Sequence, residues 1–93
     1  MTHELKSWPE VFESRLEGFK PWEFRNNDRK FYVGDFIHER EWNPKTERYT
    51  GRSILSRITC LYDGRGAYAR SFGIPKDRCI MTLDTILPGD TKA

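Results

Sequence analysis

The sequence has few cysteines and no long apolar run. Cys60 and Cys79 are the two cysteines among 93 residues, which are too few and too widely spaced for a zinc site or a disulfide scaffold. Both lie in apolar stretches, so we interpret them as reduced core thiols of a cytoplasmic protein. No segment reaches the apolar length of a membrane span, and residues 1–8 are too charged for a signal peptide.

Sequence signatures of catalysis are also scarce. The chain has no glycine-rich phosphate loop followed by a lysine, no convincing Ser-His-Asp arrangement and no internal repeat. We therefore expect neither a metal nor a cofactor. The net charge is only +2, which excludes a polycation that coats nucleic acid by charge alone.

Arginines are nevertheless concentrated in one stretch. Between positions 48 and 70 the sole acid is Asp63, and the arginines number five: Arg48, Arg52, Arg57, Arg65 and Arg70. Arginine suits bidentate recognition of phosphates and base edges. The alternative is that these side chains face solvent and pair with acids elsewhere in the chain.

The length and the pattern of apolar residues predict one small domain over residues 1–93, with a core at about 3–86 and a tail at 87–93. Pro9 predicts the first turn of a helix, with Ser7 as a possible cap and Gly18 as its end. The helix would bury an apolar stripe made of Trp8, Val11, Phe12, Leu16 and Phe19.

Most of the remaining chain reads as strands and turns. Gly51 predicts a bulge in a long strand, Asn-Pro at 43–44 marks a hairpin loop, and glycines mark a mobile loop at 63–73. Cys79, Met81 and Leu83 share one face of the last strand by period-two alternation. The expected extended segments are 3–6, 22–26, 30–33, 36–42, 48–62 and 78–86. This order favours an antiparallel, barrel-like sheet with a helix packed against it.

The segment from Gly18 to Arg29 is the richest in functional groups. If residues 22–26 are extended, Glu23 and Arg25 share one face, and Trp22 and Phe24 share the other. We predict an ion pair between Glu23 and Arg25 and expect Trp22 to face the core. The simpler interpretation is a surface strand with an exposed ion pair, which would stabilise the fold little.

These residues resemble the Gly-x-Lys-x-x-Glu-x-Arg signature of ASCH domains in the PUA-like superfamily. The order of the flanking pieces is that of a small ASCH-like family of bacteria and phages: His3-Glu4-Leu5-Lys6, Asn27-Asp28-Arg29, Val33-Gly34-Asp35 and Tyr49-Thr50-Gly51-Arg52. The resemblance implies a mainly β (α+β) fold, a small antiparallel β-barrel of five or six strands with one N-terminal helix near its mouth. It also implies that a Lys-Glu-Arg cluster lies in a cleft beside that helix.

The resemblance implies RNA or nucleotide binding at the Lys-Glu-Arg cluster. With the residues expected near that cluster, the candidate contacts are Lys20, Glu23, Arg25, Arg29, Arg52 and Lys6. Lys20 and Arg25 would receive a phosphate, a carbonyl or a base edge. Glu23 would orient one of them or accept hydrogen bonds from the amino group of a base. Arg29 would point back to the cleft, Arg52 would use the close backbone approach that Gly51 permits, and Lys6 would line the mouth. Each of these residues also has a purely structural interpretation as a solvated or ion-paired side chain.

Two alternative functions stay open. One ASCH branch, the acetylcytidine amidohydrolases, uses a lysine that matches Lys20 together with a threonine, and here Glu23 replaces that threonine. A carboxylate is not a hydroxyl nucleophile, so binding is favoured over catalysis, although Lys20 and Glu23 would be the catalytic pair of an enzyme. The other alternative is a phage-type protein that binds a host protein or a small nucleotide signal.

Overall fold

The computed structural model describes residues 1–67 and 71–87 and is mainly β, as predicted. Leu87, the first residue of the predicted tail at 87–93, belongs to the last strand. The rest of that tail and part of the predicted loop at 63–73 lie outside the described residues. In chain order the elements are β1 (Thr2–Ser7), α1 (Pro9–Leu16), β2 (Trp22–Asn26), β3 (Phe36–Asn43), β4 (Arg48–Asp63) and β5 (Arg78–Leu87). Of the expected extended segments, residues 30–33 form a loop instead, in which Lys30 adopts a φ of 51°.

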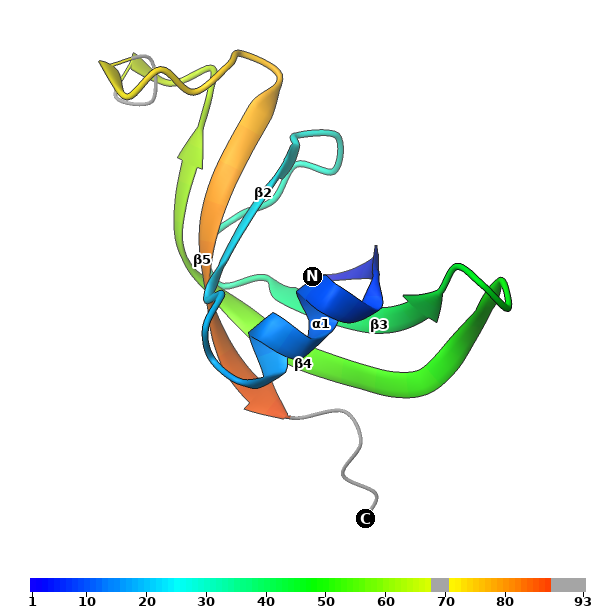
Figure 1. The fold of residues 1–93 in the computed structure, drawn as a ribbon. Helices are drawn as coiled ribbons and strands as arrows, with labels where there is room; N and C mark the ends of the chain where they lie inside the picture. The colour runs from blue at the N-terminus through cyan, green and yellow to red at the C-terminus, as the bar shows by residue number, and fades with distance from the viewer. Residues whose placement is uncertain (68–70, 88–93) are drawn as a thin grey trace.

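The strands form one curled sheet in the order β1-β3-β4-β5-β2 (Figure 1). The pairs β3–β4, β4–β5 and β2–β5 are antiparallel, but β1 lies parallel to β3, which differs from the uniformly antiparallel sheet expected. A parallel pair requires a long crossover, and here α1 and β2 lie between the two strands in the chain. The sheet is therefore a half-barrel with β1 and β2 at its edges.

The long strand β4 joins the two halves of this sheet. It pairs with β3 through its first part and with β5 through its second part. Gly51 has a φ of 97°, and the β3–β4 register shifts between Arg40 and Trp42, so the predicted bulge at Gly51 is confirmed. Bulges increase the local twist, and this one lies where the β3–β4 hairpin bends.

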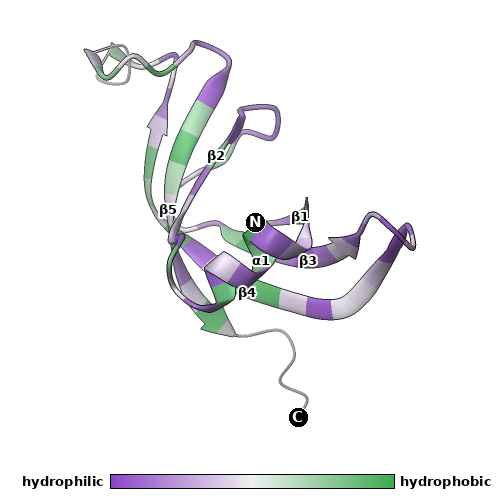
Figure 2. Ribbon diagram, viewed as in Figure 1, coloured by the Kyte–Doolittle hydropathy of each residue, from purple (hydrophilic) through white to green (hydrophobic). Residues whose placement is uncertain are grey.

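The core cluster draws most of its residues from β1, β3, β4 and β5. Cys79, Met81 and Leu83 are all buried, as the alternation in β5 predicts, and they pack with Leu5, Phe31, Ile37 and Ile58. Figure 2 shows hydrophobic residues concentrated in β4 and β5, whereas the β3–β4 hairpin is hydrophilic.

Burial raises the pKa of the Cys79 thiol to about 11. Cys60 is exposed, contrary to the prediction, because the β4–β5 register shifts between Ile58 and Cys60.

Helix α1 begins at Pro9 and ends before Gly18, as predicted, but its cap and its packing differ from the prediction. Gly18 has a φ of 83° and follows the C-cap residue Glu17, which confirms it as the helix stop. Ser7 is not a cap, since the N-cap is Trp8 and no side chain caps the helix. Trp8 and Phe19 are exposed, so the predicted apolar stripe is wrong at both ends.

The face that α1 buries consists of Phe12 and Arg15, which are three residues apart and therefore neighbours on the helix surface. Phe12 is fully buried, and the Arg15 side chain is 1% exposed. The helix thus places one apolar and one charged side chain against the sheet. None of the helices in the described part of the chain is long and apolar enough to cross a membrane.

Candidate functional site

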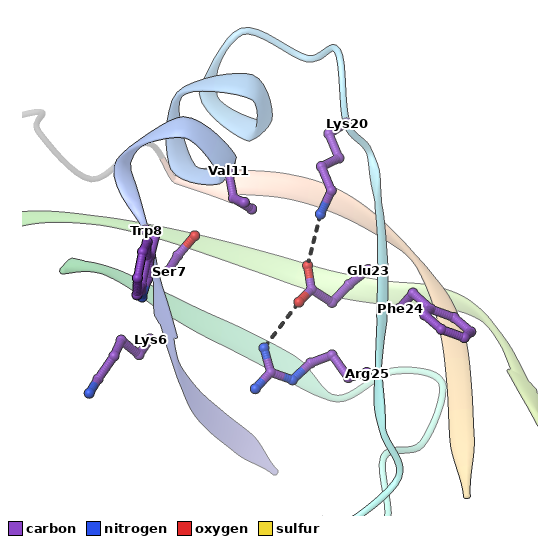
Figure 3. Close-up of a pocket in the computed structure, with 8 residues that line it drawn as sticks. All are labelled: Lys6, Ser7, Trp8, Val11, Lys20, Glu23, Phe24 and Arg25. Atoms are coloured by element: carbon purple, nitrogen blue, oxygen red, sulfur yellow. Dashed lines mark hydrogen bonds and ion pairs between the residues drawn. The ribbon is translucent and has the colours of Figure 1, made fainter. Parts of the chain in front are cut away.

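A pocket of about 300 Å³ lies between the β1–α1 junction and β2. Figure 3 shows Lys6, Ser7 and Trp8 on one side of it and Lys20, Glu23 and Arg25 on the other. Val11 and Phe24 complete the lining, although the Phe24 ring lies on the other side of β2 from the Glu23 and Arg25 side chains (Figure 3). The pocket therefore lies at the mouth of the half-barrel, between its two edge strands.

The structure brings the predicted Lys-Glu-Arg cluster together. Arg25 donates from Nη1 to Oε2 of Glu23 over 3.0 Å, and Lys20 Nζ lies 3.4 Å from Oε1. The predicted ion pair between Glu23 and Arg25 is thus confirmed. The Arg25 and Lys20 side chains stay 31% and 22% exposed, whereas that of Glu23 is 12% exposed. Glu23 therefore lies beneath the two cations and holds them at the surface of the pocket.

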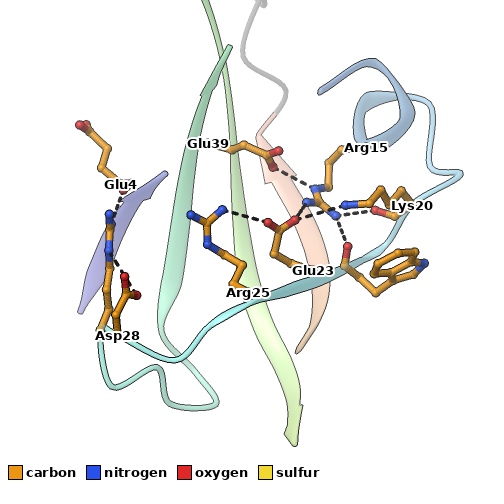
Figure 4. Close-up of polar contacts among 9 residues, drawn as sticks. Glu4, Arg15, Lys20, Glu23, Arg25, Asp28 and Glu39 are labelled. Atoms are coloured by element: carbon orange, nitrogen blue, oxygen red, sulfur yellow. Dashed lines mark hydrogen bonds and ion pairs between the residues drawn. The ribbon is translucent and has the colours of Figure 1, made fainter. Parts of the chain in front are cut away.

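Arg15 contacts this cluster from the α1 side (Figure 4). Its Nη2 donates to Glu23 Oε1, its Nε donates to Glu39 Oε1 over 2.9 Å, and its Nη1 donates to the carbonyls of Lys20 and Trp22 over 2.5 and 2.6 Å. One buried guanidinium therefore joins α1 to β2 and β3. Sequence analysis missed Arg15 and Glu39. The feature of the sequence that could have indicated Arg15 is its position three residues after Phe12, on the face that a short helix would bury.

Electrostatics keep Glu23 ionised. Burial acts to raise the pKa of its carboxyl group, but the charges of Arg15 and Lys20 and the hydrogen bonds from Arg25 and Arg15 outweigh burial. The pKa therefore lies below its usual value of 4.5. At neutral pH Glu23 is a hydrogen-bond acceptor among three cations, and it has no proton to donate.

The burial of the two faces of β2 is the reverse of the prediction. Glu23 and Arg25 do share a face, but Glu23 is the buried residue at 9% exposure, while Trp22 and Phe24 are 45% and 43% exposed. The expectation that Trp22 faces the core is wrong. The face of β2 that points into the half-barrel meets the charged side chain of Arg15, which favours a carboxylate over an indole.

Of the other three predicted contacts, one lines the pocket and two do not. Lys6 lines the pocket, and its Nζ lies 4.2 Å from the centroid of the Trp42 ring. Arg29 does not line the pocket, and its Nη1 donates to the carbonyl of Glu4 in β1.

Arg52 also lies outside the pocket lining. Its Nε donates to Glu41 and its Nη2 to Glu13, each over 2.9 Å. The hydrogen bonds that Arg52 donates to these two carboxylates, Glu41 first and then Glu13, raise its pKa above its usual range. The guanidinium therefore links the β3–β4 hairpin to α1.

A second hollow of about 290 Å³ lies at the far end of β2, where Asn27, Arg65, Lys76 and Asp77 line it. Arg65 is ion-paired with Asp63 over 2.8 Å, and Asp77 adds a further negative charge to the hollow. This hollow has a weaker positive character than the first, and none of the six predicted contacts lines it. Among the described residues no group of His, Cys, Asp and Glu side chains suits a metal ion.

Known structures share this architecture. The crystal structure of ASCH from Zymomonas mobilis and that of the ZmASCH S128A mutant protein match with TM-scores of 0.59 and 0.60. They are 15% and 16% identical to this chain, and the matches cover 95% and 94% of it and 72% of each of those chains. The fold is therefore that of a PUA-like ASCH domain, as the resemblance implied.

Within that class, the family model described as "Domain of unknown function (DUF3850)" matches residues 2–83, and the chain belongs to this family. It is also 39% identical over 61 residues to the "Uncharacterized 12.9 kDa protein in GpA 3'region" of Escherichia phage P2. That match covers 66% of this chain and 54% of the phage protein. The chain thus spans about half the length of the phage relative.

Proposed function

We propose that this protein is an RNA- or nucleotide-binding module whose ligand occupies the pocket between β1, α1 and β2. The observation that carries the proposal is the lining of that pocket: three cations, one ionised carboxylate and an exposed indole surround about 300 Å³. Ligand pockets usually hold about 300–1,000 Å³. The size therefore suits one nucleotide better than a length of folded RNA.

Lys20 and Arg25 are the proposed phosphate contacts. Glu23 holds one edge of the Arg25 guanidinium and leaves the side chain about one-third exposed. The remaining N–H groups of an arginine can donate to phosphate oxygens, and charge-assisted bonds of this kind are the stronger ones. Since Glu23 is itself fixed by the buried Arg15, the two cations are held in place before a ligand arrives.

Trp8 is the proposed platform for the base. It is 55% exposed and lines the pocket opposite Arg25, as Figure 3 shows. Stacking of a base on an aromatic ring contributes about 1–3 kcal/mol and tolerates any base. Lys6, two residues before Trp8, adds positive charge on the same side of the pocket.

Hydrolysis is less well supported by this environment. A general base works best with a pKa near the working pH, whereas the pKa of Glu23 is held below its usual value by three cations. Lys20 is engaged by Glu23 and lies over the Trp22 ring, 4.6 Å from its centroid. Both groups are therefore better suited to holding an anion than to activating water.

The test is a titration at low salt of fluorescently labelled single-stranded RNA, with unlabelled nucleotides as competitors. Lys20→Ala and Arg25→Ala should each weaken binding by about 1–3 kcal/mol, and added salt should weaken it further because phosphate contacts release counterions. The matched controls are Lys45→Ala and Arg48→Ala, which remove the same charges from exposed positions beside the β3–β4 turn. Absence of binding to every RNA and nucleotide, or an equal loss in the controls, contradicts the proposal.

A further inference from the structure

We propose that the natural ligand is a single strand of RNA that crosses the edge strand β2. One nucleotide occupies the pocket, and the adjoining nucleotide stacks on Trp22 and Phe24 on the opposite face of β2. This inference rests on the proposed function and extends it from a nucleotide site to a path for the strand. It commits to RNA as the occupant of this face, in place of a peptide or a second copy of the chain.

The outer face of β2 presents two aromatic rings at regular spacing. Trp22 and Phe24 are 45% and 43% exposed, and residues two apart in a strand lie roughly 7 Å apart on the same face. Their partners in β5 are Thr82 and Ile80, which carry no charge. The two rings therefore lie over a neutral part of the sheet and form a surface for stacking.

Each ring has a cation beside it. Lys20 Nζ lies 4.6 Å from the centroid of the Trp22 ring, and Arg78 Cζ lies 5.8 Å from that of Phe24. Exposed rings flanked by cations match the alternation of base and phosphate in a nucleic-acid strand. A purely apolar peptide would have to remove water from both cations without pairing them, which is costly.

Lys20 connects the two faces of β2. Its Nζ lies 3.4 Å from Glu23 Oε1, on the pocket side, and also lies over the ring of Trp22 on the outer side. A phosphate that links a nucleotide in the pocket to one stacked on Trp22 would pass close to this ammonium group. Because β2 is the last strand of the sheet, no further strand pairs with its outer edge among the described residues, and the backbone of the ligand can cross there.

The experiment compares the dissociation constants of uridine 5′-monophosphate and of oligouridylates of two and four nucleotides, measured by calorimetry at low salt. The oligonucleotides should bind about 5- to 150-fold more tightly than the mononucleotide, which corresponds to one further stacked base. In Trp22→Ala this length advantage should collapse towards one. In Arg25→Ala both affinities should fall together and the ratio should persist.

Two further variants keep the result interpretable. Trp22→Leu retains an apolar side chain without an aromatic face and should also lose the advantage, so the test stands even if Trp22→Ala fails to fold. Tyr32→Ala removes an aromatic side chain that is 64% exposed and lies outside both surfaces, and it should retain the advantage.

Equal affinities for mono- and oligonucleotides, or an advantage that survives in Trp22→Leu, would overturn the inference while leaving the proposed function intact. A change in sedimenting mass in the Trp22 variants, with the length advantage preserved, would assign the face to self-association instead. If neither kind of ligand binds, the proposed function fails, and this inference fails with it.

Discussion

Arg15 is the residue on which the geometry of the pocket depends. Its guanidinium is almost fully buried and joins the carboxylates of Glu23 and Glu39 to the backbone at Lys20 and Trp22. Removal of the Arg15 guanidinium would leave the buried carboxylate of Glu39 without the cation that it pairs with, whereas Glu23 would keep Lys20 and Arg25. Breaking a buried ion pair by removing one partner is strongly destabilising, even where the intact pair contributes little net stability.

We predict that Arg15→Met lowers the free energy of unfolding by about 3–5 kcal/mol. The substitution keeps apolar volume, so the loss reports the missing charge and hydrogen bonds. Urea denaturation of the variant and the parent measures it, with Arg48→Met at an exposed position as the control, for which a change within about 0.5 kcal/mol is expected. A loss below about 1 kcal/mol for Arg15→Met would show that the network contributes little.

The charged pair on β2 was predictable from sequence, and the residue beneath it was not. Period-two alternation places Glu23 and Arg25 on the same face of β2, and the hydrogen bond between them confirms this. Which face is buried depends on the partner that α1 supplies. An arginine inside a helix is ordinarily a solvated residue, so nothing in the pattern ranked Arg15 above the aromatic residues, and Trp22 was placed in the core in error.

At the scale of elements, the short connection between α1 and β2 positions Lys20. The helix ends at Leu16, Gly18 reverses the chain with a φ of 83°, and β2 begins at Trp22. A Cβ atom added at Gly18 would meet nothing within 4 Å. The requirement for glycine is therefore conformational rather than a matter of space.

We predict that Gly18→Ala destabilises the fold by about 1–2 kcal/mol, because the Cβ atom of alanine is strained in the left-handed conformation. Gly18→Asn should cost less, since asparagine adopts this conformation more readily. Thermal or urea denaturation of the two variants measures the difference. Equal losses for both variants would contradict the conformational explanation.

Most strands were predictable, whereas their pairing was less so. The alternation of β5, the bulge at Gly51 and the turn after Asn43 are local features, and the structure confirms them. The parallel pairing of β1 with β3 depends on the path of the chain through α1 and β2. The alternation of residues within a strand does not indicate the direction of its partner. The outward position of Cys60 depends on a register shift in β4, which is equally non-local.

At the scale of the whole molecule, buried carboxylates link neighbouring elements of the half-barrel. Glu23 joins β2 to α1, Asp35 accepts from His3 over 2.8 Å, and Glu41 accepts from Arg52 over 2.9 Å. The pKa of each carboxyl group lies below its usual value. For Asp35 and Glu41 the leading cause is the hydrogen bond from His3 and from Arg52 respectively, whereas for Glu23 the cations overcome the effect of burial.

These lowered pKa values predict acid sensitivity. A carboxyl group whose pKa is lower in the folded state stabilises the fold above its unfolded pKa, and this stabilisation is lost as the pH falls through its folded pKa. The free energy of unfolding should therefore be steady near neutral pH and decline below about pH 4.5, the usual pKa of a glutamate. Urea denaturation between pH 7 and pH 2 measures this, and Glu23→Gln should show a shallower decline. A curve that stays flat to pH 2 would contradict the assignment.

The central claim is that the mouth of the half-barrel, between its edge strands β1 and β2, is a nucleotide site. The most direct test is a two-dimensional amide NMR titration of the isotopically labelled protein with uridine 5′-monophosphate. The shifted signals should cluster on residues 6–8 and 20–25, and the signals of Lys45 and Arg48 should not move. Shifts confined to Asn27, Arg65, Lys76 and Asp77, which line the other hollow, or no shifts at millimolar ligand, would contradict it.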